Sequence, residues 1–95
     1  MRKVEIDGMK YELIEDERNC FDEEKFIKKC TDYFYPYDYI FGDYSYDELR
    51  LKGFYESDNK LATKINDIKY LENYKVNYCS YGAKTFLLKK LTKRL

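Results

Sequence analysis

The sequence contains no histidine and no tryptophan, and its single proline is Pro36. Histidine is the usual proton shuttle near neutral pH and the commonest transition-metal ligand in proteins. Its absence leaves a serine, threonine or cysteine nucleophile without the usual general base. The sequence also has no glycine-rich loop of the kind that binds phosphate, since Gly42 and Gly53 stand alone. We therefore interpret the chain as a non-enzymatic binding or accessory protein, for which no cofactor is expected.

Cysteine is sparse, and Cys20, Cys30 and Cys79 do not form a CxxC pair. An odd number of widely spaced cysteines does not fit a disulfide scaffold or a zinc site, so free thiols and no bound metal are expected. No segment reaches the ~20 apolar residues that a membrane-spanning helix needs, and the first residues do not resemble a signal peptide. These features together predict a cytoplasmic protein without a membrane partner.

Net charge is also absent, because 18 basic residues balance 18 acidic ones. A formal charge of zero argues against a general polyanion-binding protein. The two halves differ, however: residues 1–50 contain eight basic and fourteen acidic residues, and residues 51–95 contain ten and four. Attraction between the two halves is one explanation of this asymmetry, and a basic surface for nucleic acid is the other.

Hydrophobic and aromatic residues are plentiful, at 44% and 19% of the chain, and twelve of the aromatic residues are tyrosine. Such a composition supplies enough apolar surface to offset the entropy lost on ordering the chain. Ninety-five residues suit one compact domain with one modest core. We expect a single domain over residues 1–95, and the sequence leaves open whether the basic tail at 92–95 is ordered.

Two segments near the N-terminus carry clear signals. Residues 3–6 and 9–14 alternate in polarity around Asp7-Gly8, a dipeptide that favours a tight hairpin turn. Residues 21–34 have apolar side chains at helical spacing. In that helix Asp22 is a suitable N-cap, and Phe21 can pack on the first turn. Pro36 is expected to stop the helix.

The remaining segments predict a second hairpin, a second helix and a last strand. We expect strands at 37–41 and 49–55 around a turn at 42–45, a helix at 66–79 ended by Gly82, and a strand at 83–91. Asp47 and Glu48 could instead begin a short helical turn. The predicted order is β-β-α-β-β-α-β, and the predicted fold is a single-domain α+β fold with two helices on a mainly antiparallel sheet.

The segment YDYIFGDYSYDELRLKGFY, residues 37–55, is the most unusual part of the chain. It resembles the signature segment of the YutD-like family, small proteins of low-GC Gram-positive bacteria and their relatives. The helix FDEEKFIKKC and the C-terminal run NYCSYGAKTFLLKKL fit the same family pattern. The chain departs from the pattern at Ala83, where a cysteine is common, and at Tyr44, where tryptophan is common. The resemblance implies the fold and a bacterial cytoplasmic origin, and it implies no mechanism.

The candidate binding residues lie mainly in the signature segment. Alternation places Leu49 and Leu51 on the buried side of the second hairpin and Arg50 and Lys52 on the other side. Aromatic residues surrounded by basic ones can stack and pair with single-stranded RNA. The leading hypothesis is association with RNA or a ribonucleoprotein through Arg50, Lys52 and the basic C-terminal segment. The candidate binding residues are the following: Asp43, Tyr44, Arg50, Lys52, Lys89 and Lys90.

A second hypothesis uses the tyrosines instead of the basic residues. The tyrosines between Tyr37 and Tyr46 are too many for all their hydroxyls to be buried and hydrogen-bonded in a small core. Tyrosine and arginine are enriched at the energetic centres of protein interfaces. The alternative function is therefore a protein-protein interaction module, and the sequence does not indicate an oligomeric state.

Overall fold

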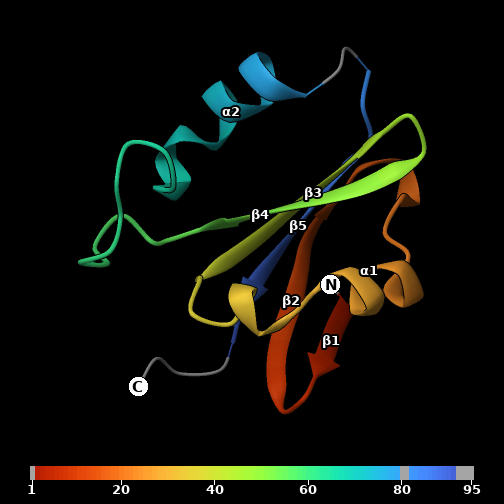
Figure 1. Cartoon of the computed structure of the whole chain (residues 1–95), viewed down its shortest axis with the longest axis horizontal. Coiled ribbons are helices and arrows are strands. Elements are labelled where there is room, and N and C mark those ends of the chain that lie inside the picture. Colours follow the sequence, from red (N-terminus) through yellow and green to blue (C-terminus); the bar gives the residue numbers. More distant parts are fainter. Residues whose placement is uncertain (1, 80–81, 92–95) are drawn as a thin grey trace.

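The computed structural model describes residues 2–79 and 82–91, which form a five-stranded sheet with one helix on each face (Figure 1). The strands are β1 (Arg2–Ile6), β2 (Met9–Asp16), β3 (Tyr39–Ser45), β4 (Glu48–Phe54) and β5 (Thr85–Lys90), and the α-helices are α1 (Glu23–Lys29) and α2 (Leu71–Tyr78). The strands lie in the order β1-β2-β5-β3-β4, and all neighbours are antiparallel. The predicted α+β fold and element order are confirmed.

The N-terminal hairpin forms where the sequence predicts it. Asp7 and Gly8 connect β1 to β2 with φ angles of 48° and 80°. A two-residue turn with positive φ at both positions matches the twist of the flanking strands. The hairpin then joins the rest of the sheet because β2 pairs with β5 as well as with β1.

Helix α1 begins as predicted but ends early. The Asp22 carboxylate accepts a hydrogen bond from the Lys25 backbone N–H at 3.2 Å, and the rings of Phe21 and Phe26 pack with their centroids 5.6 Å apart. The helix ends at Lys29 because Cys30 adopts an extended conformation while its side chain is buried in the core. The prediction that the helix reaches residue 34 and is stopped by Pro36 is therefore wrong. A separate 3-10 turn (Asp32–Phe34) supplies the later apolar contacts.

The turn of the second hairpin also differs from the prediction. β3 runs straight through residues 42–45, and the turn consists of Tyr46 and Asp47, with φ angles of 52° and 65°. No helical turn forms at Asp47. The turn was predicted at the wrong place because glycine and aspartate are typical turn residues. Here Gly42 and Asp43 are instead buried residues of β3.

The C-terminal elements follow the prediction more closely. A 3-10 turn (Ile68–Tyr70) leads into α2, and the Asp67 carboxylate caps it by accepting from the Lys69 N–H at 3.0 Å. Gly82 has the predicted positive φ, 75°, but residues 80 and 81 beside it lie outside the described part of the chain. β5 is central in the sheet and pairs with β2 and β3. The basic tail at 92–95 also lies outside the described residues.

Each face of the sheet carries its own apolar core. The α1 face is the larger one and packs around Phe26 and Phe86. The α2 face packs around Phe41, Phe54 and Leu71, with Tyr74 laid against both phenylalanines. Because both faces are covered, a side chain on either face reaches solvent only near an edge of the sheet.

Candidate functional site

The structure divides the six predicted binding residues between the two faces of the sheet. In the β3–β4–β5 register, the α2 face carries Asp43, Arg50, Lys52 and Lys89. The α1 face carries Tyr44 and Lys90. The six residues therefore do not share one face of the sheet, because alternate residues of a strand point to opposite faces.

Asp43 and Arg50 form an internal clamp. The Asp43 carboxylate is only 2% exposed and accepts hydrogen bonds from Arg50 Nε at 3.2 Å and Arg50 Nη2 at 2.5 Å. The same Nη2 donates to the Tyr78 carbonyl at 3.2 Å, at the last turn of α2. A guanidinium at a helix C-terminus satisfies carbonyls that have no partner within the helix. Arg50 therefore fastens α2 to the sheet.

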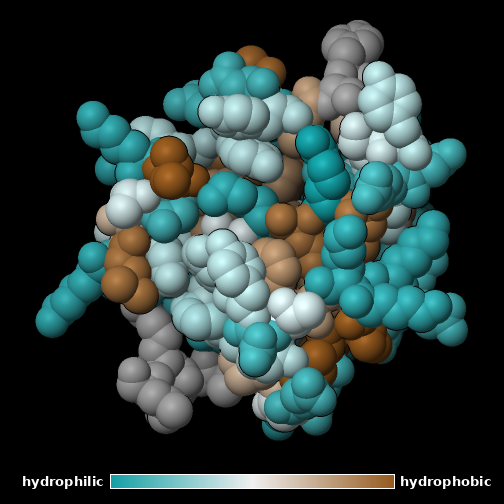
Figure 2. Space-filling view, viewed as in Figure 1, coloured by the Kyte–Doolittle hydropathy of each residue, from teal (hydrophilic) through white to brown (hydrophobic). Residues whose placement is uncertain are grey.

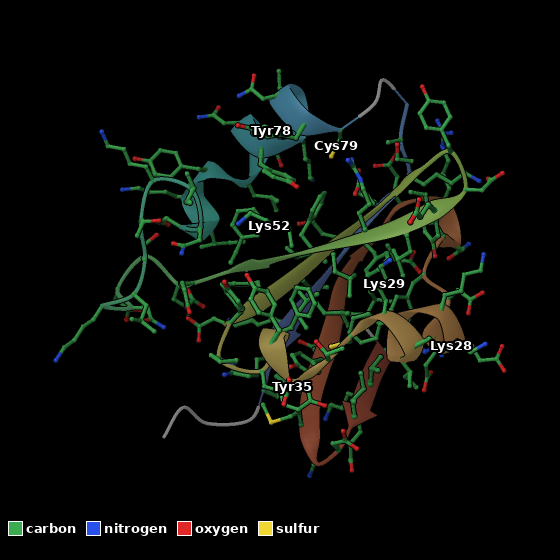
Figure 3. All side chains as sticks on the ribbon, viewed as in Figure 1. Lys28, Lys29, Tyr35, Lys52, Tyr78 and Cys79 are labelled. Atoms are coloured by element: carbon green, nitrogen blue, oxygen red, sulfur yellow. The ribbon has the colours of Figure 1, made fainter. Side chains whose placement is uncertain are left out.

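Lys52 lies under α2 as well, and it is half-buried (Figure 3). Its Nζ lies 5.1 Å from the centre of the Phe54 ring and donates to the Gly53 carbonyl at 3.4 Å. Burial lowers the pKa of the Lys52 ammonium, since desolvation disfavours the charged form. A partly desolvated ammonium that faces an aromatic ring gains more from an incoming anion than a fully hydrated lysine does.

The two lysines of β5 do not join Lys52 in one basic surface. Lys89 lies 3.8 Å from the Glu56 carboxylate, and its Nζ lies over the Tyr39 ring. Lys90 points to the other face, where its Nζ donates to the Tyr35 carbonyl at 2.8 Å. Both therefore take part in contacts within the chain.

The tyrosines of residues 37–46 differ widely in exposure. Tyr39 is buried and donates to Glu56 at 2.8 Å, and the hydroxyl of Tyr44 is buried against the α1 face. Tyr37 stacks on Tyr55 with ring centroids 4.6 Å apart. Only Tyr46, at the hairpin tip, is fully open to solvent, with 99% of its surface exposed. The expectation that some tyrosines reach the surface is confirmed, but they do not form one aromatic patch.

A groove between α2 and β4 is the better candidate site. It has a volume of ≈ 450 Å³ and is called the α2–β4 groove below. It is lined by three tyrosines, two lysines, two asparagines and an isoleucine: Lys52, Lys64, Ile65, Tyr70, Asn73, Tyr74, Asn77 and Tyr78. Lys52 comes from β4, and most of the other lining residues come from α2 and the segment before it. In Figure 3, Tyr78 and Lys52 lie on the two sides of the space between α2 and β4.

The lining of the α2–β4 groove carries positive charge and is rich in tyrosine, a residue type that is common in protein interfaces. None of its lining residues is a carboxylate, so the charges of Lys52 and Lys64 are not balanced within it. Ile65 and Tyr78 are 76% and 66% exposed, although both are large and apolar or aromatic. Tyr74 stacks beside Tyr78 with ring centroids 5.0 Å apart. The groove therefore offers rigid aromatic surface, an exposed aliphatic group and positive charge to a single ligand.

Two buried aspartates hold the loop that carries Ile65. Asp38 accepts from the Glu56 N–H at 2.8 Å and from the Asn59 side chain at 3.0 Å. Asp67 accepts from the Ser57 hydroxyl at 2.6 Å. The hydrogen bond from Ser57 is the main cause that lowers the pKa of Asp67. A second hydrogen bond, from the Lys69 backbone N–H, lowers it further. The loop between β4 and α2 is therefore joined through Asp38 to the start of β3 and closed on itself through Asp67.

Sequence reasoning missed most of the groove. Tyr70, Tyr74 and Tyr78 repeat every four residues and therefore share one face of the α2 segment. That spacing was visible in the sequence, but it is also the spacing of a helix that buries its tyrosines. Ile65 and Lys64 gave no signal, because their position depends on a turn held by Thr63 and Asn66 and on the pairing of Tyr55 with the residues that follow this turn.

The three cysteines of this fold are weak acids. Burial raises the pKa of the Cys20, Cys30 and Cys79 thiols to about 11, so all three are protonated near neutral pH. Within residues 2–79 and 82–91, no group of three or more cysteine, aspartate and glutamate side chains is placed to hold a metal ion. In the same part of the chain, no helix is long and apolar enough to cross a membrane.

Comparison with known proteins places the chain in a family. The family model described as "Putative antitoxin YutD-like" matches residues 5–89. The chain belongs to the YutD-like family. It is 39% identical over 88 residues to a protein of Bacillus subtilis (strain 168) named "Putative antitoxin YutD", and the match covers 93% of this chain and 97% of that protein. The solution NMR structure of protein yutD from B. subtilis has a TM-score of 0.80 to this fold, with 36% identity, and covers 100% of this chain and 86% of that chain.

The segment that resembles the YutD-like signature acts mainly inside the fold. Gly42 lies directly under the Phe86 ring, and Gly53 lies directly under the Tyr37 ring. Between them, Asp43 and Arg50 fasten α2. Of the motif's charged residues beyond this clamp, Lys52 faces the α2–β4 groove. This part of the YutD-like pattern is therefore explained by packing of the sheet against α2, and the groove lies next to it.

Proposed function

We propose that this YutD-like protein acts as an antitoxin that binds a protein toxin through the α2–β4 groove. The observation that carries the proposal is the lining of that groove, which combines exposed Ile65 and Tyr78 with lysines and contains no carboxylate. The name of the B. subtilis relative, which is 39% identical, supports the antitoxin role and the choice of a protein partner. The function is binding, and no catalytic step is part of it.

The make-up of the groove suits a protein partner. Tyrosine offers a large contact area at small conformational cost, and tyrosines near the centre of an interface often contribute most of its affinity. Tyr74 is already fixed between Phe41, Phe54 and Tyr78, so little entropy is lost when a partner covers it. The positive charge of Lys52 and Lys64 favours a partner surface that carries carboxylates.

Association with RNA, the hypothesis favoured by the sequence, receives less support. Arg50 is committed to Asp43 and α2, and Lys90 is committed to a backbone carbonyl on the opposite face. The rest of the basic C-terminal segment, at 92–95, lies outside the described residues. RNA therefore enters as an outcome of the test below, and the cytoplasmic location expected from the sequence stays a prediction.

The proposal is tested by capture and by growth. The tagged protein is purified from the bacterium that encodes it, with and without nuclease, and the retained protein is then produced alone and together with this chain. We expect a nuclease-resistant partner that stops growth when produced alone and does not stop growth when co-produced. Ile65→Asp is expected to weaken partner binding by about tenfold or more, because it places a charge among apolar contacts.

A matched control separates the groove from the rest of the helix surface. Val76 is 81% exposed on α2 but does not line the groove, so Val76→Asp should leave partner binding and growth rescue unchanged. Loss of the partner on nuclease treatment would favour RNA and overturn the proposal. Equal rescue by the Ile65→Asp variant would show that the toxin binds elsewhere.

A further inference from the structure

β4 forms one edge of the sheet, and among the described residues it pairs with β3 alone. An edge strand presents a row of backbone N–H and C=O groups that can pair with another chain. Figure 1 shows β4 crossing the front of the molecule between α2 and α1, with neither helix lying over the strand in this view. The outer edge is closed just beyond β4, where the Tyr55 N–H donates to the Asn66 carbonyl and the Tyr55 carbonyl accepts from the Ile68 N–H. A partner strand would therefore pair with the part of β4 before Tyr55.

The register shows which backbone groups of β4 face outward. Tyr46 and Asp47 form a two-residue turn with positive φ, so the flanking residues Ser45 and Glu48 form a hydrogen-bonded pair. Hydrogen-bonded pairs then alternate along the ladder, and Arg50 and Lys52 bond to β3. The groups that point away from the sheet belong to the residues between them: Leu49, Leu51 and Gly53. Of these, the Gly53 carbonyl already accepts from Lys52 Nζ at 3.4 Å, so Gly53 offers its N–H.

A hollow lies on each side of this edge. The α2–β4 groove is on one face. On the other face is a smaller hollow of ≈ 260 Å³, which we call the α1–β4 recess. It is lined by six residues of α1 and the β3–β4 hairpin: Lys25, Lys28, Lys29, Asp47, Glu48 and Leu49. Figure 2 shows hydrophobic surface in the middle of this view, in the region between α2 and α1, with hydrophilic side chains around it. An added strand would send alternate side chains into the two hollows.

Both hollows are basic on balance. Together their linings contain five lysines and two carboxylates, counting the six residues of the recess and the eight of the groove. Lys29 lies 4.0 Å from Glu48, and Lys28 and Lys29 stand on the α1 side of β4 in Figure 3. A second copy of this edge would bring like charges together. A strand with carboxylates on both of its faces would be attracted to both hollows.

We propose that β4 binds an extended, acidic segment of the partner protein as a sixth strand of the sheet. The inference rests on the proposed function and deepens it, since it names the binding mode and the chemistry of the bound segment. Backbone hydrogen bonds to Leu49, Leu51 and Gly53 supply affinity, and lysines on the two faces supply specificity. The partner segment therefore contacts this chain mainly along β4. Its side chains enter the α2–β4 groove on one face and the α1–β4 recess on the other.

The test uses a defined probe on the full chain. A capped peptide Thr-Glu-Val-Asp-Glu-Val-Thr, which places carboxylates on both faces when extended, is titrated into the labelled protein while backbone amide signals and hydrogen exchange are followed. We expect the amides of Leu49, Leu51 and Gly53 to become protected. The same peptide with lysine in place of its acidic residues should not bind. Lys52→Glu should weaken peptide binding by about tenfold, which corresponds to about 1.4 kcal/mol. Lys3→Glu, on the opposite edge of the sheet, is the control and should leave peptide binding unchanged.

A proline variant tests the backbone contact directly. Leu51→Pro removes an outward N–H and leaves the ladder to β3 intact, and Leu51→Ala is the control for the lost side chain. We expect Leu51→Pro to weaken peptide binding by about tenfold relative to Leu51→Ala. If the proline variant fails to fold, amide protection in the unmodified chain decides the question.

The outcomes separate this inference from the proposed function. Peptide binding that leaves the Leu49, Leu51 and Gly53 amides unprotected overturns strand addition, as does a dimer joined through β4. A toxin that binds the Leu51→Pro variant and not the Ile65→Asp variant overturns strand addition while the antitoxin role stands. Protection of the three amides without any toxin partner in the cell overturns the antitoxin role and keeps the edge as a binding site for acidic strands.

Discussion

Two glycines of the second hairpin show how single residues determine the packing of this fold. A Cβ atom added at Gly42 would lie 2.2 Å from Cζ of Phe86, and one added at Gly53 would lie 2.3 Å from Cγ of Tyr37. Both distances are far below van der Waals contact. The Phe86 ring is 1% exposed and is packed against Phe21 and Phe26, so it has no space to move. Gly42 therefore tolerates substitution less well than Gly53.

We predict that Gly42→Ala lowers the free energy of unfolding by about 1–3 kcal/mol, the usual cost of overpacking a core. Gly53→Ala should cost less, because the Tyr37 ring is half-buried and can shift toward solvent. Urea unfolding followed by circular dichroism measures both values. In a Phe86→Leu background, the additional cost of Gly42→Ala should shrink, since the ring that meets the new methyl group is gone. An unchanged cost in that background would contradict the proposed contact.

The sequence could not reveal these contacts. Gly42 and Asp43 look like turn residues because glycine and aspartate favour turns, and this local preference misplaced the second hairpin turn. Their actual roles depend on Phe86 and Arg50, which reach them only when β3 pairs with β5 and β4. Asp7-Gly8 was predicted correctly because there the local preference and the final structure agree.

At the scale of elements, α2 depends on β4 for its position. Its apolar residue Leu71 is buried at the first turn, while its last turn is held by the Arg50 side chain through the Tyr78 carbonyl. Cys79, the next residue, has its pKa raised to about 11, first by burial and then by the neighbouring Asp43 carboxylate. The clamp therefore joins β3, β4 and the C-terminal end of α2, and it supports one wall of the α2–β4 groove.

We predict that Arg50→Met lowers the free energy of unfolding by about 1.5–3 kcal/mol, the range for hydrogen bonds to charged groups. The loss comes mainly from a buried Asp43 carboxylate without its cation. Hydrogen exchange should quicken in the last turn of α2 before it quickens in β3 and β5. Adding Asp43→Asn to Arg50→Met should recover part of the loss, because the buried charge is then removed. A double variant as unstable as the sum of the single ones would contradict the clamp.

The elements themselves were largely predictable, whereas their ends were not. Alternation and helical spacing located every strand and both helices, since those patterns report which face is buried. Helix α1 ended five residues before the predicted residue 34, because Cys30 turns into the core, a tertiary effect without a local signal. The face of β4 was also misjudged. Arg50 and Lys52 do point away from Leu49, but α2 covers that face.

At the scale of the whole molecule, the opposite charges of the two halves do not act as simple mutual attraction. Lys75 and Glu15 join the halves, at 3.6 Å, whereas Arg50 with Asp43 lies within the first half. Part of the excess positive charge of the second half instead lines the α2–β4 groove through Lys52 and Lys64. The asymmetry seen in the sequence is thus partly a property of the candidate binding surface.

The whole fold also buries weak acids that ionise at alkaline pH. The pKa values of Cys20, Cys30 and Cys79 are raised from 9.0 to about 11, mainly by burial. The pKa of Tyr39 is raised from 10.0 to about 12 by burial and by its hydrogen bond to Glu56. The unfolded chain loses these protons at lower pH than the folded chain does. Above pH 9 the folded state therefore binds more protons, and its stability falls as pH rises.

We predict that the urea midpoint is insensitive to these groups below about pH 8 and falls progressively between about pH 9 and pH 11, the interval between the ordinary and the raised thiol pKa. Tyr39 adds to the decline from about pH 10 and continues it to about pH 12. The measurement is a series of urea unfolding curves at increasing pH under reducing conditions. Replacing Cys30, whose shift is due to burial alone, with alanine should make the decline between pH 9 and 11 shallower. A midpoint that stays level or rises over that interval would show that the thiols ionise as easily in the folded protein as in the unfolded chain.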